Sequence, residues 1–196
     1  MRVLHADDRL VVIDKPAGLL SVPGRTEPDC ASARVQALYP DALIVHRLDQ
    51  ATSGLLLFAR GIEAQRELSA DFAARRVAKV YVAVVAGRLE GEGVIDLPLG
   101  ADWPNRPRQQ VDHERGKPSQ TRWRVLAHEG AHTRLRLEPL TGRSHQLRVH
   151  LAALGHAILG DALYAAPDIA AASPRLQLHA SELGVSGDYF TSPPEF

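Results

Sequence analysis

The sequence predicts an α+β fold built on a mixed, largely antiparallel β-sheet that is flanked by helices and loops. Segments rich in β-branched residues outnumber the helical patterns, and two of these segments are separated by only two residues, as in a hairpin. The helical patterns at 61–76 and 141–156 each have one apolar side. With 196 residues, 45% of them hydrophobic, the chain is long enough to form one domain with a substantial core.

The first predicted elements are a strand, a loop, a helix and a second strand. Residues 9–25 read as a strand that runs into a loop broken by prolines and glycines. Residues 31–40 predict a short helix that ends at Pro40. The apolar run Leu55–Ala59, bounded by Gly and Arg, is typical of a strand buried on both faces in the middle of a molecule.

An amphipathic helix and a strand follow this central strand. Residues 61–76 predict the helix, on which Ile62, Leu68 and Phe72 share the side that faces the core. Residues 79–87 are rich in valine and include a tyrosine, which favours a strand.

The remaining elements are a hairpin, a helix and a last strand. Residues 121–129 and 132–140 flank a Gly-Ala pair and predict an antiparallel hairpin, whose second strand alternates between Arg and Leu. Residues 141–156 predict a turn and then a helix, with Ser144 as its N-cap. Residues 175–183 predict the last strand.

Composition excludes several classes of protein. The single cysteine rules out an intramolecular disulfide and a cysteine-based zinc site. Charged residues interrupt the N-terminus where a signal peptide needs an apolar core, and no stretch is long enough to span a membrane, so we expect a cytoplasmic protein. The net charge of zero argues mildly against nucleic-acid binding. However, only 3 of the 23 basic residues are Lys, and arginine suits phosphate and base recognition.

Positive charge gathers in two segments. Residues 102–124 form a proline-containing, loop-rich stretch with six basic and three acidic residues, and such a stretch suits a phosphate backbone as well as plain solvent. Residues 141–150 contain two arginines, two histidines and no acid, which makes them the most electropositive short segment.

Asp49 is the most suggestive single residue, because a carboxylate stands only a few positions before the predicted central strand. It either ties down a turn or serves in chemistry. The sequence lacks a second nearby carboxylate, a G-x-S-x-G elbow, a zinc-binding pair of helical histidines and a P-loop. One carboxylate among many arginines suits a nucleophilic Asp that an Arg keeps ionised and that acts on an anionic polymer.

The segment "HRLDQATSGLLLFAR" at 46–60 resembles the signature of the RluA family of RNA pseudouridine synthases. Four further segments are similar to segments of that family in the same order, and together they span essentially the whole chain: 11–24, 79–87, 140–165 and 175–183. Residues 96–121 resemble the dual-specificity branch, which modifies a uridine in 23S rRNA and one in a tRNA anticodon stem-loop.

The resemblance implies a pseudouridine synthase catalytic fold with a central RNA-binding cleft. Residues 1–196 would form a single catalytic domain without the N-terminal RNA-binding domain that many relatives carry. The expected partners are 23S rRNA and tRNA, with no cofactor, no metal and no membrane, and the expected state is a monomer.

Three residues are catalytic by this resemblance. Asp49 would attack C1′ of the ribose or support abstraction of a neighbouring ribose proton. Arg148 would pair with Asp49; without the resemblance it would read as an exposed helical arginine. Tyr81 would stack on the uracil and place its hydroxyl near C5; otherwise it would read as a core tyrosine of a strand.

Further residues are expected to bind the RNA. Arg47 would enter the space that the extruded base leaves, or would form a salt bridge that supports Asp49. Contacts with the RNA are also expected from Arg143, His145, Arg106 and Arg108. Two other functions remain open at this point, namely an RNA-binding chaperone on the same fold and a nucleoside hydrolase that uses the Asp as nucleophile.

Overall fold

A computed structural model describes all residues 1–196, which divide into two compact units. The first unit comprises residues 1–79 and 179–195, and the second comprises residues 80–178 and 196. The prediction of a single catalytic domain stays a prediction, as does the central cleft. No helix is long and apolar enough to cross a membrane.

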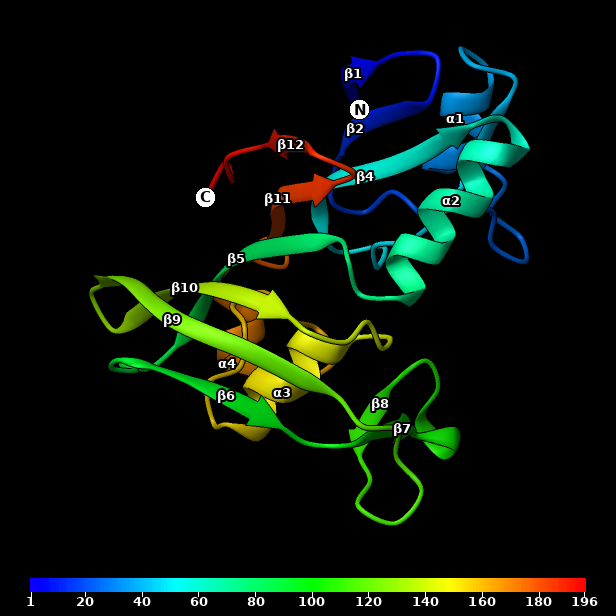
Figure 1. The fold of residues 1–196 in the computed structure, drawn as a ribbon. Helices are drawn as coiled ribbons and strands as arrows, with labels where there is room; N and C mark the ends of the chain where they lie inside the picture. Colours follow the sequence, from blue (N-terminus) through cyan, green and yellow to red (C-terminus); the bar gives the residue numbers. More distant parts are fainter. The chain divides into compact units, whose positions relative to one another are not determined.

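The first unit is a sheet with two helices (Figure 1). The strand order in this part of the sheet is β1-β2-β4-β11; in addition, β3 pairs with β4 and β12 pairs with β11. All its strand pairs are antiparallel except β4 with β11, which run parallel. Its elements are β1 (Arg2–Ala6), β2 (Leu10–Lys15), α1 (Ala31–Gln36), β3 (Ala42–Ile44), β4 (Ser53–Arg60), α2 (Gly61–Ala73), most of β11 (Leu178–Val185) and β12 (Asp188–Thr191).

The core of this unit lies along β2 and β4. Residues 10–13 and 55–59 are at most 1% exposed, so the predicted central strand is confirmed. Leu68 of α2 is also buried, but Ile62 is 52% exposed, and its predicted place in the core is wrong. Ile62 stands in the first turn of α2, directly after Gly61 turns the chain out of β4 with φ +75.

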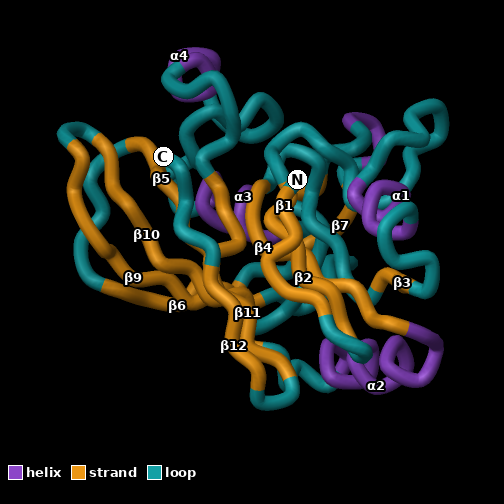
Figure 2. The backbone as a smooth tube through the Cα atoms, turned by 90° about the horizontal axis from the view of Figure 1, so that it is seen from above, coloured by secondary structure: helices purple, strands orange, loops and turns teal.

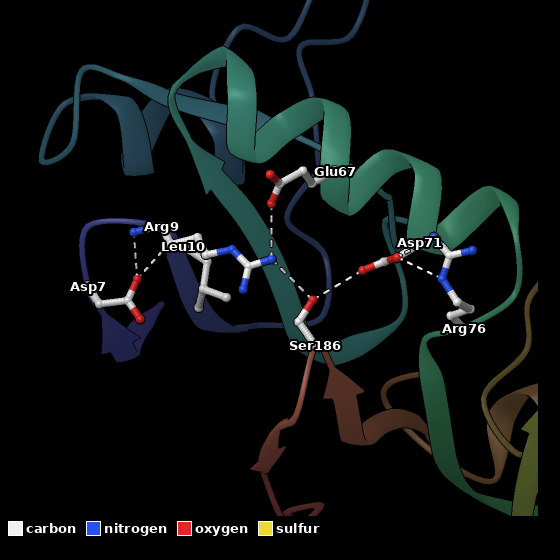
Figure 3. Close-up of polar contacts among 7 residues, drawn as sticks. All are labelled: Asp7, Arg9, Leu10, Glu67, Asp71, Arg76 and Ser186. Carbon is white, nitrogen blue, oxygen red and sulfur yellow. Dashed lines mark hydrogen bonds and ion pairs between the residues drawn. The ribbon is translucent and has the colours of Figure 1, made fainter.

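A polar network ties three surface segments of the first unit together (Figure 3). Arg9, in the β1–β2 turn, donates to Glu67 of α2 and to the Ser186 hydroxyl, both at 3.3 Å. Ser186, in the β11–β12 turn, donates in turn to Asp71 of α2 at 3.1 Å. The two turns are therefore held against the same helix.

The second unit contains the antiparallel order β5-β10-β9-β6, and Figure 2 shows β10, β9 and β6 side by side. A separate two-stranded sheet pairs β7 with β8. Its elements are most of β5 (Ala78–Ala86), β6 (Glu92–Asp96), β7 (Leu99–Ala101), a 3-10 turn (Trp103–Asn105), β8 (Gln109–Val111), β9 (Gln120–Glu129), β10 (His132–Pro139), α3 (Gln146–Ala153) and α4 (Pro167–Ala171).

The predicted hairpin is confirmed as β9 and β10. Leu135 and Leu137 are fully buried, while Arg134 and Arg136, which alternate with them, keep partial exposure, as the alternation predicted. Helix α3 packs against β9 and β10 and buries His150, which bonds the Thr121 hydroxyl at 2.9 Å and the Leu97 carbonyl at 3.0 Å. Burial lowers the pKa of His150, so this ring is a neutral structural group.

Helix α3 differs from prediction at its start. The N-cap is His145 in the left-handed region (φ 55), not Ser144. The Gln146 side chain organises the preceding turn, because its Oε1 accepts from the Thr141 hydroxyl at 2.7 Å and from the Arg143 N–H at 3.1 Å. No side chain caps the first turn of α3, so the expected serine cap is wrong, and the Gln146 amide fixes the turn before the helix instead.

Candidate functional site

Asp49 lies in the loop between β3 and β4 and is half-buried. Its carbonyl accepts from the Thr52 N–H at 3.1 Å, which closes a turn directly before β4. Beside it, the Ser21 hydroxyl donates to the Leu48 carbonyl at 2.7 Å and accepts from the Leu48 N–H at 3.1 Å. The backbone of this loop is therefore fixed on both sides of the carboxylate.

Lys15 is a buried cation close to this loop, and sequence reasoning missed it. Its side chain has no exposed surface, and its Nζ donates to the carbonyls of Pro16, Leu19 and Gln50 at 2.9, 2.7 and 3.1 Å. Burial lowers the pKa of Lys15 to about 8, and the negative charge of Asp49 opposes this shift. The ammonium thus joins the loop after β2 to the turn that carries Asp49.

The Thr-Ser-Gly segment after Asp49 is locked against β11. Gly54 has φ +109, and a Cβ there would overlap the backbone of Ala180 on the neighbouring parallel strand. The hydroxyl of Ser53 hydrogen-bonds Nδ1 of the buried His179 at 2.9 Å, and His179 Nε2 bonds the Ser192 carbonyl at 3.0 Å. These contacts fix the end of the Asp49 loop at the start of β4.

His46 anchors the beginning of the same loop. Its Nε2 accepts from the Leu57 N–H of β4 at 3.0 Å, and its ring stacks on Phe72 of α2 with centroids 4.6 Å apart. Burial lowers the pKa of His46 to about 3, so the ring stays neutral and Nε2 stays an acceptor. The next residue, Arg47, is exposed.

Arg148 is buried in the second unit, so it is not the exposed helical arginine that the sequence alone would suggest. It is 4% exposed and forms a bidentate ion pair with Asp161, which is 1% exposed. Its Nε and one terminal nitrogen donate to the two carboxylate oxygens at 2.8 and 2.7 Å. Asp161 also accepts from the N–H groups of Leu163 and Tyr164, so its carboxylate is held in one orientation.

Asp161 is a second residue that sequence reasoning missed. It follows Gly160, whose φ is +75 and whose missing Cβ would overlap the Arg175 carbonyl. The Gly-Asp pair inside the segment that matched the family was the available signal.

Tyr164 brings several of the predicted residues together. Its hydroxyl bonds His145 Nδ1 at 2.6 Å and accepts from the Gln109 N–H at 2.8 Å. The guanidinium carbons of Arg108 and Arg148 lie 5.5 and 5.0 Å from the centre of its ring. Predicted RNA-binding and catalytic groups of the second unit therefore meet around one tyrosine that the sequence did not single out.

The other predicted residues take separate positions. Tyr81 is half-buried on β5, opposite Leu137 of β10. Arg143 is exposed in the turn before α3, and Arg106 is exposed between β7 and β8. Asp49 and Arg47 belong to the first unit and Arg148 to the second, so the pairing of Asp49 with Arg148 stays a prediction.

No group of three or more His, Cys, Asp or Glu side chains is arranged to hold a metal ion. The metal-free and cofactor-free site stays a prediction.

Residues 9–153 match the family model described as RNA pseudouridylate synthase. The chain is 50% identical over 200 residues to the dual-specificity RNA pseudouridine synthase RluA of Yersinia pestis, covering 100% of this chain and 97% of the relative. It is 52% identical over 188 residues to the protein of the same name from Escherichia coli strain K12, covering 94% and 86% of the two chains.

Two human structures are similar across nearly the whole chain. RNA Pseudouridylate Synthase Domain Containing 1 superposes with a TM-score of 0.86 and 27% identity, over 100% of this chain and 84% of that one. RNA Pseudouridylate Synthase Domain Containing 4 gives a TM-score of 0.77 and 25% identity, over 93% and 83%. The predicted α+β fold with a mixed, mostly antiparallel sheet is confirmed.

Proposed function

The chain belongs to the RNA pseudouridylate synthase family, and we propose that Asp49, Tyr81 and Arg148 carry its reaction on a uridine in structured RNA. It is an isomerase that converts uridine to pseudouridine. The observation that carries the proposal is 50% identity over the whole chain to an enzyme named for this activity.

The reaction breaks the C1′–N1 bond and joins C1′ to C5 of the same base, after which C5 loses its proton. No atom is gained or lost, so the chemistry needs no cofactor. Asp49 acts as an anion that attacks C1′ or supports removal of a ribose proton. The nearby ammonium of Lys15 attracts this anion, and the fixed loop backbone holds it in place.

Arg148 supplies a positive charge whose orientation is set by Asp161. Because Asp161 fixes the orientation of this guanidinium, we propose that it pairs with a second anion, the Asp49 carboxylate. Tyr81 stacks on the uracil and brings its hydroxyl near C5 for the final proton transfer. Arg47, which is exposed, fills the space left by the extruded base.

The substrates we propose are 23S rRNA and a tRNA anticodon stem-loop, because the relatives with 50% and 52% sequence identity are named as dual-specificity enzymes. Arg106, Arg108, Arg143 and His145 contact this RNA in a cleft. Two of them, Arg108 and His145, lie at Tyr164 near Arg148, which supports a common surface. We propose that the enzyme is a cytoplasmic monomer.

The test is release of tritium from RNA labelled at C5 of uridine, with rRNA and tRNA transcripts assayed separately. The unmutated protein should release tritium, and Asp49→Asn should bind the same RNA without releasing any. Turnover by Asp49→Asn near that of the unmutated protein would remove Asp49 from the mechanism. Absence of release from both RNA classes would contradict the proposed substrates.

A further inference from the structure

Trp103 is an exposed aromatic side chain at the tip of the β7–β8 hairpin, in the second unit. Its exposed fraction is 67%, whereas Trp123, the other tryptophan of the chain, is 9% exposed. Single exposed apolar residues are common and need no function. The surroundings of Trp103 are what distinguish it.

The loop that carries Trp103 is braced internally. Asp102 and Arg108 are joined by a backbone hydrogen bond of 3.0 Å across the base of the tip, and the Asn105 N–H donates to the Asp102 carbonyl at 3.1 Å. The Asn105 side-chain amide also donates to the Asp102 carboxylate at 3.0 Å. Because these bonds close the loop on itself, the indole is presented on a pre-formed turn.

One face of the indole carries a cation. The guanidinium carbon of Arg106 lies 3.3 Å from the centre of the Trp103 ring, which is a stacked cation–π pair. Residues 102–110 contain Arg106 and Arg108 against one acidic residue, Asp102, whose carboxylate accepts from the Asn105 amide. The tip therefore combines an exposed aromatic ring with nearby positive charge. Proteins that bind single-stranded nucleic acid use the same two features.

The tip is also connected to the residues proposed to act in the reaction. Gln109, directly after it, donates its N–H to Tyr164 at 2.8 Å, and Tyr164 contacts His145 and Arg148. A ligand held at Trp103 is thus held at a fixed position relative to Arg148.

We infer that Trp103 is a stacking platform for an unpaired nucleobase of the RNA, distinct from the uridine that reacts. The base stacks on the indole while Arg106 and Arg108 contact the adjacent phosphates. This inference rests on the proposed RNA substrate and adds a recognition element to it: the enzyme selects RNA with a splayed base beside the target.

The experiment measures binding of Trp103→Ala and Trp103→Phe to an RNA hairpin with a single-stranded loop, and to a blunt RNA duplex of equal length. Loss of one base–aromatic stack should raise the Kd for the hairpin by about 5-fold to 150-fold in Trp103→Ala. Trp103→Phe should recover part of this loss. The duplex, which offers no unpaired base, should bind all three proteins equally.

Tyr189→Ala is the matched control, because Tyr189 is another aromatic residue with high exposure, 60%, and belongs to the first unit. Its Kd for the hairpin should not change. Equal weakening of hairpin and duplex by Trp103→Ala, or no weakening of either, would overturn the inference.

Tryptophan fluorescence gives a readout that does not depend on turnover. The RNA hairpin should quench the tryptophan emission of the unmutated protein and of Asp49→Asn. This quenching should disappear in Trp103→Phe, whose only tryptophan is Trp123. An unquenched unmutated protein would refute stacking. Quenching without tritium release would refute the proposed function and leave the stacking platform standing.

Discussion

Replacing Asp161 by Asn removes the negative charge opposite Arg148 while keeping the size of the side chain. Three N–H donors converge on Oδ1 of Asp161, from Arg148, Leu163 and Tyr164. In the variant Asp161→Asn the amide carbonyl would occupy the place of Oδ1, so the new amide nitrogen would point at Nε of Arg148. Two donors would then face each other where a 2.8 Å bond existed.

The expected loss follows from the burial of the pair. Arg148 and Asp161 are 4% and 1% exposed, and removing one partner of a buried ion pair costs about 3–5 kcal/mol. We expect the lower end, about 3 kcal/mol of unfolding free energy, because the variant keeps the Oδ1 acceptor. With a urea m-value of about 2 kcal/mol/M, the midpoint should fall by about 1.5 M.

Urea unfolding followed by circular dichroism measures this shift. The control is Asp29→Asn, since Asp29 accepts the same bidentate contact from Arg34 at 2.7 and 2.5 Å but both side chains are about half exposed. Solvent screens such pairs, so the control midpoint should not move measurably. Adding Arg148→Met to Asp161→Asn should restore much of the stability. If Asp161→Asn alone were as stable as the unmutated protein, the reasoning would be refuted.

Three other perturbations test the remaining groups around the site. The pKa of Lys15 is about 8 in the folded protein and 10.5 in the unfolded chain, so the unfolded chain binds more protons between these pH values. The free energy of unfolding should therefore rise by about 3 kcal/mol as pH rises from about 8 to 10.5. Urea midpoints across that range should lose this rise in Lys15→Met. The ring of His46 has a folded pKa of about 3 against 6.5 unfolded, so stability should fall as pH falls through that window, by about 5 kcal/mol in full. His46→Gln should flatten the acid limb of the same titration; an unchanged limb would contradict the assignment. Tyr164→Phe loses the hydroxyl that bonds His145 and Gln109 and should raise KM for RNA more than it lowers kcat in tritium release. An equal fall in kcat and kcat/KM would argue instead for a role in the transition state.

Local pattern was sufficient for the elements whose burial follows the sequence directly. The apolar run of β4 and the alternation of β10 each depend on nearest neighbours along one strand, and both strands form where expected. The short edge strands β1, β6 and β12 were not predicted. Their residues are mostly exposed or half-buried, so they lack the apolar signal that marks a central strand.

Long-range contacts explain what sequence reasoning missed at the site. One of the three carbonyls that accept from the buried Lys15 ammonium is that of Gln50, 35 positions away. Tyr164 gains its place from Gln109, which is 55 positions away. A lysine or tyrosine in isolation reads as a surface or core residue, and only the folded chain brings its partners within hydrogen-bonding distance.

The distribution of buried charge supports the assignment of the catalytic residues. A buried ion is unfavourable unless its partners compensate, and a fold has little structural need for one. Yet Lys15 is buried close to Asp49, and Arg148 is buried against Asp161. Each unit therefore holds a charged group with under 5% exposure at or beside a residue that the family pattern marks as catalytic. The proposed catalytic roles offer one reason for keeping these charges, because apolar residues of similar volume often serve stability equally well.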